Sequence, residues 1–209
     1  MIWHKIQGAG GVGGQPDIIG FEVGAVTPNP SVNTPSGIVA GNLLVWTGAV
    51  SNGSWSNIAS EVSAAGFTMR STNFTETNPS CFVATRVVDG SEAASYSLTE
   101  SDDALCAMIA LNLTFDVAGA FTKDAFDTSF DITGITVANA GSYLFTIGGV
   151  GNASALTVVS GTELFNTGGV ADPTLAVHYE TVSAGASGTR TITRPNTTGG
   201  IGGVLFAAY

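Results

Sequence analysis

Residues 139–150 read NAGSYLFTIGGV, a turn followed by a strand, and turns and strands alternate in this way along most of the chain. The first three residues of this stretch favour a turn. Tyr143, Phe145 and Ile147 then stand at every second position, so an extended backbone places their side chains on one face. This period of two predicts a strand over residues 142–150 with one face against a core.

Other stretches have the same character, since they are rich in Val, Ile, Thr and aromatic residues and are bounded by turn residues. We predict further strands at 18–27, 37–50, 67–73, 80–88, 94–99, 104–115, 135–138, 156–160, 174–182, 188–193 and 202–209. Leu43–Trp46 and Ala104–Leu111 are apolar at successive positions, so we expect both to be central strands.

Two stretches could be helical, and both are short: Asn57–Ala65 and Phe121–Phe130. Many short strands with almost no helix predict an all-β fold, an antiparallel β-sandwich for which we expect the jelly-roll type. No period of 20–50 residues indicates a solenoid or a propeller.

The composition agrees with a single β domain and argues against several partners. The chain has 209 residues, a usual length for one domain. Only 11% of the residues are charged, the net charge is −10, and the six Lys and Arg residues are scattered singly. Nucleic acids and anionic membrane surfaces are bound by clustered cations, so the sequence predicts neither partner. The longest apolar stretch, 104–113, is about half the length that spans a bilayer.

Residues 1–17 differ from the rest of the chain. The run Gly8–Gly14 has too many glycines for a regular element, because each costs backbone entropy. We predict a flexible, extended arm over 1–17 that binds a partner, followed by a sandwich domain over 18–209. The arm carries three large apolar residues, Ile2, Trp3 and Ile6. Its G-x-G-x-x-G match lacks the preceding strand and following helix of a dinucleotide site.

Cys81 and Cys106 lie in apolar, strand-like runs. They could form a disulfide, but buried free thiols are favoured because free Cys packs as a small hydrophobic residue. No C-x-x-C spacing indicates a metal or redox site.

Histidine is scarce, which argues against acid–base or nucleophilic catalysis. The chain has His4, in the arm, and His178. His178 alternates with Glu180 on the strand face opposite Val177 and Tyr179, and we interpret the two as a solvent-facing polar pair. We predict no catalytic residues, and a protein that is not an enzyme.

The densest acidic positions are Asp102–Asp103 and the set Asp124, Asp127 and Asp131. Calcium requires several oxygen ligands from one loop, and no such motif is present. We therefore expect solvated turns, no metal and no cofactor. A carboxylate pair such as Glu76 and Glu163 would suit glycoside hydrolysis, but nothing in the sequence singles it out.

Trp46 lies within a strong strand and is expected in the core. Trp55 lies in the polar stretch SNGSWSN. Its indole could stack on a sugar or anchor a partner, or it could fold back over a sheet edge.

Three motifs resemble a β-sandwich module of bacteriophage virion proteins, also found in some bacterial surface proteins. They are Gly41–Val45 (GNLLV), Gly66–Met69 (GFTM) and Thr85–Glu92 (TRVVDGSE). The module's usual forms are GDLLV, GWT and YYRVADGSE, so Asn42 and Phe67 depart from the pattern. The resemblance also covers the Ala-rich strand 104–111 and VSAGASGT at 182–189, and it extends over residues 20–209.

The resemblance implies a non-enzymatic virion protein: a capsid decoration or cement protein, a fibre or a tail appendage. Its expected partners are other virion proteins and further copies of itself, and its expected location is the virion. The alternative is a glycan-binding adhesion module used in host attachment, for which Trp55 is the candidate residue.

Overall fold

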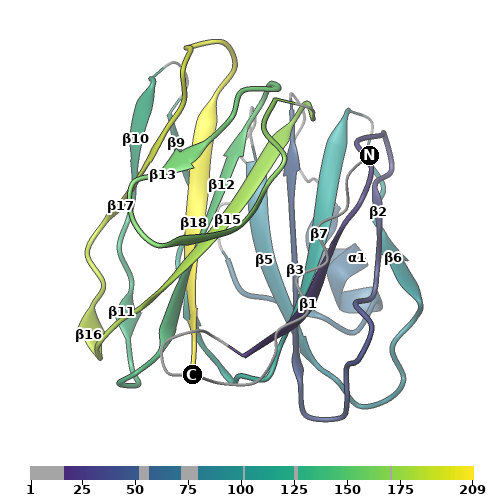
Figure 1. Cartoon of the computed structure of the whole chain (residues 1–209). Coiled ribbons are helices and arrows are strands. Elements are labelled where there is room, and N and C mark those ends of the chain that lie inside the picture. Colours follow the sequence, from purple (N-terminus) through teal and green to yellow (C-terminus); the bar gives the residue numbers. More distant parts are fainter. Residues whose placement is uncertain (1–16, 52–56, 72–79, 101, 125–126, 170) are drawn as a thin grey trace.

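Two antiparallel sheets stack face to face, and each carries a thinner layer on its outer side (Figure 1). The computed structural model describes residues 17–51, 57–71, 80–100, 102–124, 127–169 and 171–209. The predicted arm, apart from Asp17, lies outside the described residues, and so do Ile2, Trp3 and Ile6.

The first sheet has the strand order β1-β7-β3-β5-β4 and comes from the first half of the chain. Its strands are β1 (Ile18–Val23), β7 (Ala104–Leu111), β3 (Leu43–Val50), β5 (Ser80–Val87) and β4 (Thr68–Met69). The expected central strands are confirmed, because β3 and β7 are hydrogen-bonded neighbours and every residue of both is buried.

The second sheet has the order β14-β15-β12-β18-β8, with β9 also paired to β18. Its strands are β14 (Thr162–Asn166), β15 (Thr174–Thr181), β12 (Tyr143–Val150), β18 (Ile201–Ala208), β8 (Phe115–Ala118) and β9 (Thr122–Asp124).

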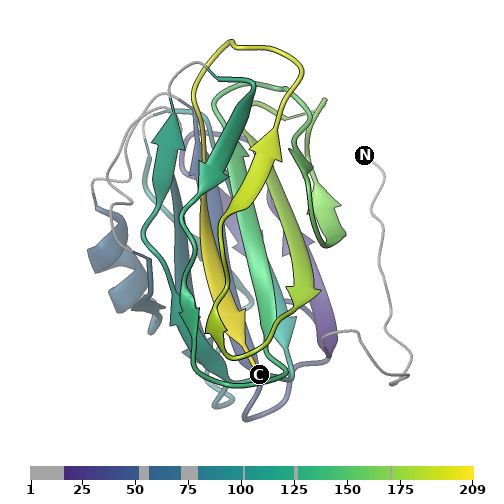
Figure 2. The ribbon, with the colours of Figure 1, turned by 90° about the vertical axis from the view of Figure 1, so that its left-hand side faces the viewer.

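The outer layers come from short elements between these strands. The first sheet is covered by α1 (Ile58–Ala64), β2 (Ser31–Asn33) and β6 (Ser95–Ser97). The second is covered by β10 (Ser129–Ile132), β17 (Arg190–Thr193) and β13 (Thr157–Val158), with β11 (Thr136–Val137) and β16 (Gly185–Ala186) beside them. Figure 2 looks onto this second cover, with β18 and β12 behind it.

The two halves of the chain build the same arrangement. In each, an eight-residue strand lies between two others of the same length. Leu43 stands opposite Val87 and Leu111, and Tyr143 stands opposite Thr181 and Ala208, so the registers are equivalent. The fold is therefore an internal repeat of two β units, each longer than the 20–50 residues of a solenoid or propeller repeat.

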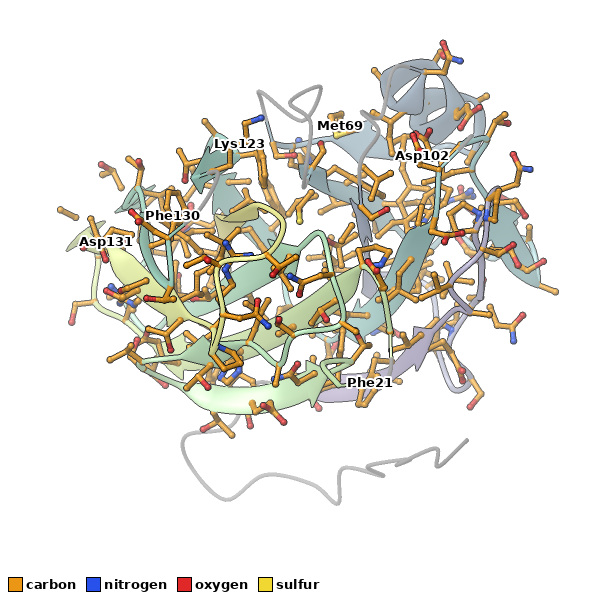
Figure 3. All side chains as sticks on the ribbon, turned by 90° about the horizontal axis from the view of Figure 1, so that it is seen from above. Phe21, Met69, Asp102, Lys123, Phe130 and Asp131 are labelled. Atoms are coloured by element: carbon orange, nitrogen blue, oxygen red, sulfur yellow. The ribbon has the colours of Figure 1, made fainter. Side chains whose placement is uncertain are left out.

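The repeat explains why the core has three parts. Alternate residues of the two sheets, such as Val45, Ile109, Ile147 and Val204, face one another and form the central cluster. The opposite faces pack under the two covers. Figure 3 shows the molecule from above, with Asp102 at one side and Phe130 and Asp131 at the other. The side chains of the core fill the space between the layers.

The antiparallel all-β sandwich predicted from the sequence is confirmed. The jelly-roll connectivity is not shown and stays a prediction. The strands of each large sheet come from one half of the chain. Helix α1 falls within the predicted Asn57–Ala65, whereas the helix expected in Phe121–Phe130 is wrong, since β9 and the start of β10 lie there. Both are paired strands, so tertiary pairing decided their form. Strands β2, β14 and β16 were not predicted, and neither was β8, of which the predicted stretch 104–115 includes only the first residue.

Candidate functional site

A surface pocket of about 310 Å³ lies at the β4 edge of the first sheet. It is lined by residues from β4, β5 and the turns beside them: Gly66, Thr68, Arg70, Thr85, Arg86, Val87 and Asp89. Thr68 and Thr85 are paired across β4 and β5, which places both hydroxyl-bearing residues at one position of the sheet. Two of the six basic residues of this acidic chain therefore share one pocket.

Arg86 lines the pocket, and each of its three guanidinium nitrogens has a partner. Its Nη1 donates to the Ala65 carbonyl at 3.2 Å, and its Nη2 donates to Asp89 Oδ1 at 3.0 Å and to Ser91 Oγ at 2.6 Å. Its Nε lies 3.4 Å from Glu92 Oε1. These contacts tie β5 to the turn that follows, so Arg86 holds the shape of the site.

The turn after β5 is stabilised by the carboxylates of two of its own residues, Asp89 and Glu92. Glu92 accepts from the Asp89 and Gly90 amides at 2.9 and 3.0 Å. Hydrogen bonds from the Ser91 hydroxyl and amide, followed by that from Arg86, lower the pKa of Asp89 to about 2. Asp89 therefore stays ionised at neutral pH, and it is one of the residues that line the pocket.

Gly66 is required where the pocket meets Arg86. Its φ is +80°, and a Cβ built there would lie 2.8 Å from Arg86 Nη1. Both the backbone conformation and the close approach favour glycine.

Among the described residues, Arg70 is the one cation of the site without an acidic partner. Its Nε donates to Thr85 Oγ1 at 2.7 Å, and its guanidinium carbon lies 4.4 Å from the centroid of the Phe115 ring. Within the described part of the chain, no carboxylate pairs with Arg70. Partial burial without such a partner lowers the pKa of Arg70, which stays charged at neutral pH.

This arrangement can bind an anion. A guanidinium stacked on an aromatic ring and anchored through Nε leaves its two Nη groups as a fork that matches a carboxylate. Phe115 belongs to β8 of the second sheet, so both repeats contribute to the site.

His178 is buried, so the prediction that it faces solvent is wrong. It does lie opposite Val177 and Tyr179, which join the central cluster, but its face is under the second cover and only 6% of its surface is exposed. Its Nε2 lies 3.6 Å from Glu163 Oε2. Burial lowers the pKa of His178, and the nearby Glu163 partly offsets this effect.

The acidic residues singled out in the sequence have separate surroundings. Asp131 accepts a hydrogen bond from the Thr191 hydroxyl at 2.5 Å. The Asp127 carbonyl accepts from Arg194 Nε at 2.9 Å. Among the described residues, no group of three or more His, Cys, Asp or Glu side chains could hold a metal ion. Glu76 lies outside the described residues, so its proposed pairing with Glu163 is not observed.

Two predictions for the core are confirmed. Trp46 is fully buried and packs edge-on against Phe67 and Phe82. Cys81 and Cys106 are buried free thiols, and they point to opposite faces of the first sheet, so no disulfide can join them. Trp55 lies outside the described residues.

The sequence did not predict this pocket, because Arg70 and Arg86 lie in separate segments of the chain. One feature of the sequence could have indicated the pocket: if GFTM and TRVVDG are taken as neighbouring strands, Thr68 lies beside Thr85. The Phe115 contact comes from the other sheet and could not have been foreseen.

Comparison with known proteins does not assign the chain to a family. No protein-family model matches it, and it has no significant match among curated proteins or solved structures. In the described residues, no helix is long and apolar enough to cross a membrane.

Proposed function

We propose that this protein is a non-enzymatic structural component of a bacteriophage virion, a capsid decoration or external appendage protein that acts by docking. The observation that carries the proposal is where the virion-module motifs lie. Leu43–Val45 belong to the fully buried β3, and Thr85–Glu92 form the end of β5 and the hydrogen-bonded turn that follows it. Motifs used for packing and turns suit a scaffold.

The sheet edges supply docking surfaces of a suitable kind. Strands β1 and β4 end the first sheet, and β14 ends the second, so each has one side without a partner strand in the described residues. Such edges bind an added strand through backbone hydrogen bonds. Partners of this scaffold would be other virion proteins and further copies of the chain.

Mass spectrometry and cryo-EM of purified particles test the proposal. We expect the protein on the particle in a fixed copy number, on the head or the tail. Its absence from purified particles, despite its presence in the lysate, would overturn the proposal.

The role of the arm has a separate test. Deletion of residues 2–14 should reduce incorporation into particles and leave the sandwich folded. A full-length variant with Ile2, Trp3 and Ile6 changed to Ser is the matched control for length, and it should show the same loss if the apolar tip does the binding. Normal incorporation of both variants would exclude the arm as the docking element.

A further inference from the structure

The pocket at β4 and β5 has features that a docking scaffold does not need. In the part of the chain that the structure describes, Arg70 is its one cation without an acidic partner, and it is held from two sides, by the Thr85 hydroxyl and the Phe115 ring. A side chain that is already oriented loses little conformational entropy when a ligand binds. Its two Nη groups remain as donors.

The size and the lining of the pocket narrow the class of ligand. A volume of about 310 Å³ is at the small end of the range for ligand pockets, about 300–1,000 Å³. Besides the two arginines, the pocket is lined by Thr68, Thr85, Asp89, Gly66 and a single large apolar residue, Val87. These groups suit a ring that carries hydroxyls, which can donate to Asp89.

The charges favour one carboxylate over a phosphate or an acidic peptide. Arg86 is already neutralised by Asp89 and Glu92, so Arg70 alone must balance the ligand. A single guanidinium matches one carboxylate in a bidentate pair. A dianionic phosphate or a second acidic side chain would stand close to Asp89, in a protein of net charge −10, and would be repelled.

We propose that this pocket binds a carboxylate-bearing sugar, such as a hexuronic acid residue of a surface glycan, with the carboxylate on Arg70 and ring hydroxyls toward Thr68 and Asp89. The site would add recognition of acidic glycans to the docking role. It does not depend on the location of the protein in a virion.

An NMR titration of the full chain tests this assignment at low ionic strength, with glucuronate as the probe. We expect shifts in the amide signals of Gly66, Arg70 and Val87, and no such shifts with glucose. Acetate should bind at least tenfold more weakly than glucuronate, because it lacks the hydroxyls. Equal effects of glucuronate and glucose, or of glucuronate and acetate, would overturn the proposal. Tighter binding of phosphate or of a Glu-rich peptide would overturn it in favour of those ligands.

Variants of Arg70 complete the test. Arg70→Gln removes the charge and should weaken glucuronate binding at least tenfold, and Arg70→Lys should not restore it, because an ammonium lacks the fork. Arg190→Gln is the matched control, since it loses the same charge from β17 in the second cover. Arg70 is solvent-exposed, and the unshifted remainder of the spectrum shows whether each variant is folded. Unchanged binding by Arg70→Gln would refute the site.

Discussion

At the contact between the two sheets, individual atoms set how closely the repeats approach. Gly149 in β12 faces Cys81 in β5, and a Cβ built on Gly149 would lie 2.3 Å from Cys81 Sγ and 3.4 Å from Ala49 Cβ. The same position of the first repeat holds Ala49, so the two repeats differ where one must make room for the other.

Gly149→Ala should destabilise the protein by roughly 1–3 kcal/mol, because an added methyl in a packed core forces side chains or backbone to move. Cys81→Ala should relieve the clash, so the double variant should be more stable than the sum of the two single changes predicts. Urea unfolding measures the free energies. Gly20→Ala in β1 is the control, since its Cβ would meet only Pro35 Cβ at 3.7 Å. Additive effects of the two changes would contradict this contact.

His178 shows what a covered polar residue does to stability. Its imidazole lies between Thr146 of β12 and Glu163 of β14 on the outer face of the second sheet. The next residue on that face, Glu180, is paired with Arg190, and of the described carboxylates it is Glu163 that favours the protonated ring. Burial is the larger effect, so the native state binds a proton less readily than the unfolded chain.

Stability should therefore fall as the pH drops below about 6.5, the usual pKa of an unfolded histidine. Because the pKa is lowered in the native state, the unfolded chain takes up more protons in this range, and acid favours unfolding. His178→Gln should make the free energy of unfolding less dependent on pH between 7.5 and 5. Asp89 does not interfere, because its pKa of about 2 confines its effect to more acidic solutions. His4→Gln is the matched control, and an unchanged slope in His178→Gln would contradict the prediction.

At the level of elements, a single arginine closes the loop between β17 and β18. Arg194 is 4% exposed, and its guanidinium donates to three backbone carbonyls. These are Asp127 at 2.9 Å, Thr198 at 2.8 Å and Gly200 at 3.3 Å. The second cover is thereby tied to the start of β18, a strand of the sheet beneath it.

Arg194→Met should lower the free energy of unfolding by roughly 2–4 kcal/mol, since it removes three hydrogen bonds from a charged donor, one of them to the buried Gly200 carbonyl. Arg190→Met removes the ion pair with Glu180 and the hydrogen bonds to the Ser187 and Thr189 carbonyls at a partly exposed position, and it should cost less than Arg194→Met. Thermal or urea unfolding distinguishes the two. Equal losses in both variants would show that the Arg194 contacts add nothing beyond those of a partly exposed arginine.

At the scale of the whole molecule, the two repeats share one central core and keep a separate outer core each. Equivalent faces of the two sheets meet, and the stacked rings of Phe21 and Phe165, 5.3 Å apart, join the edges β1 and β14. Each half alone would expose its share of the central cluster to water, so each half needs the other.

Fragments 1–113 and 114–209 should therefore associate one to one when they are produced together. The break falls between β7 and β8 and crosses no strand. Co-purification and light scattering measure the complex. Ile147→Asp, in the central cluster, should abolish association, whereas Val159→Asp, at a position 67% exposed, should not. Stable monomeric halves would contradict a shared core.

The sequence by itself determined the eight-residue strands, the buried thiols, the buried Trp46 and the small share of helix in the described residues, because these follow from local periodicity and turn residues. It did not predict the strands β9 and β10, where pairing with β18 and β17 overrides the local preference. Only the tertiary structure decided that the halves repeat one register, that His178 is covered, and that Arg70 meets Thr85 and Phe115. Those features depend on contacts between residues far apart in the chain, and the period of a strand specifies which face a residue takes but not what will cover that face.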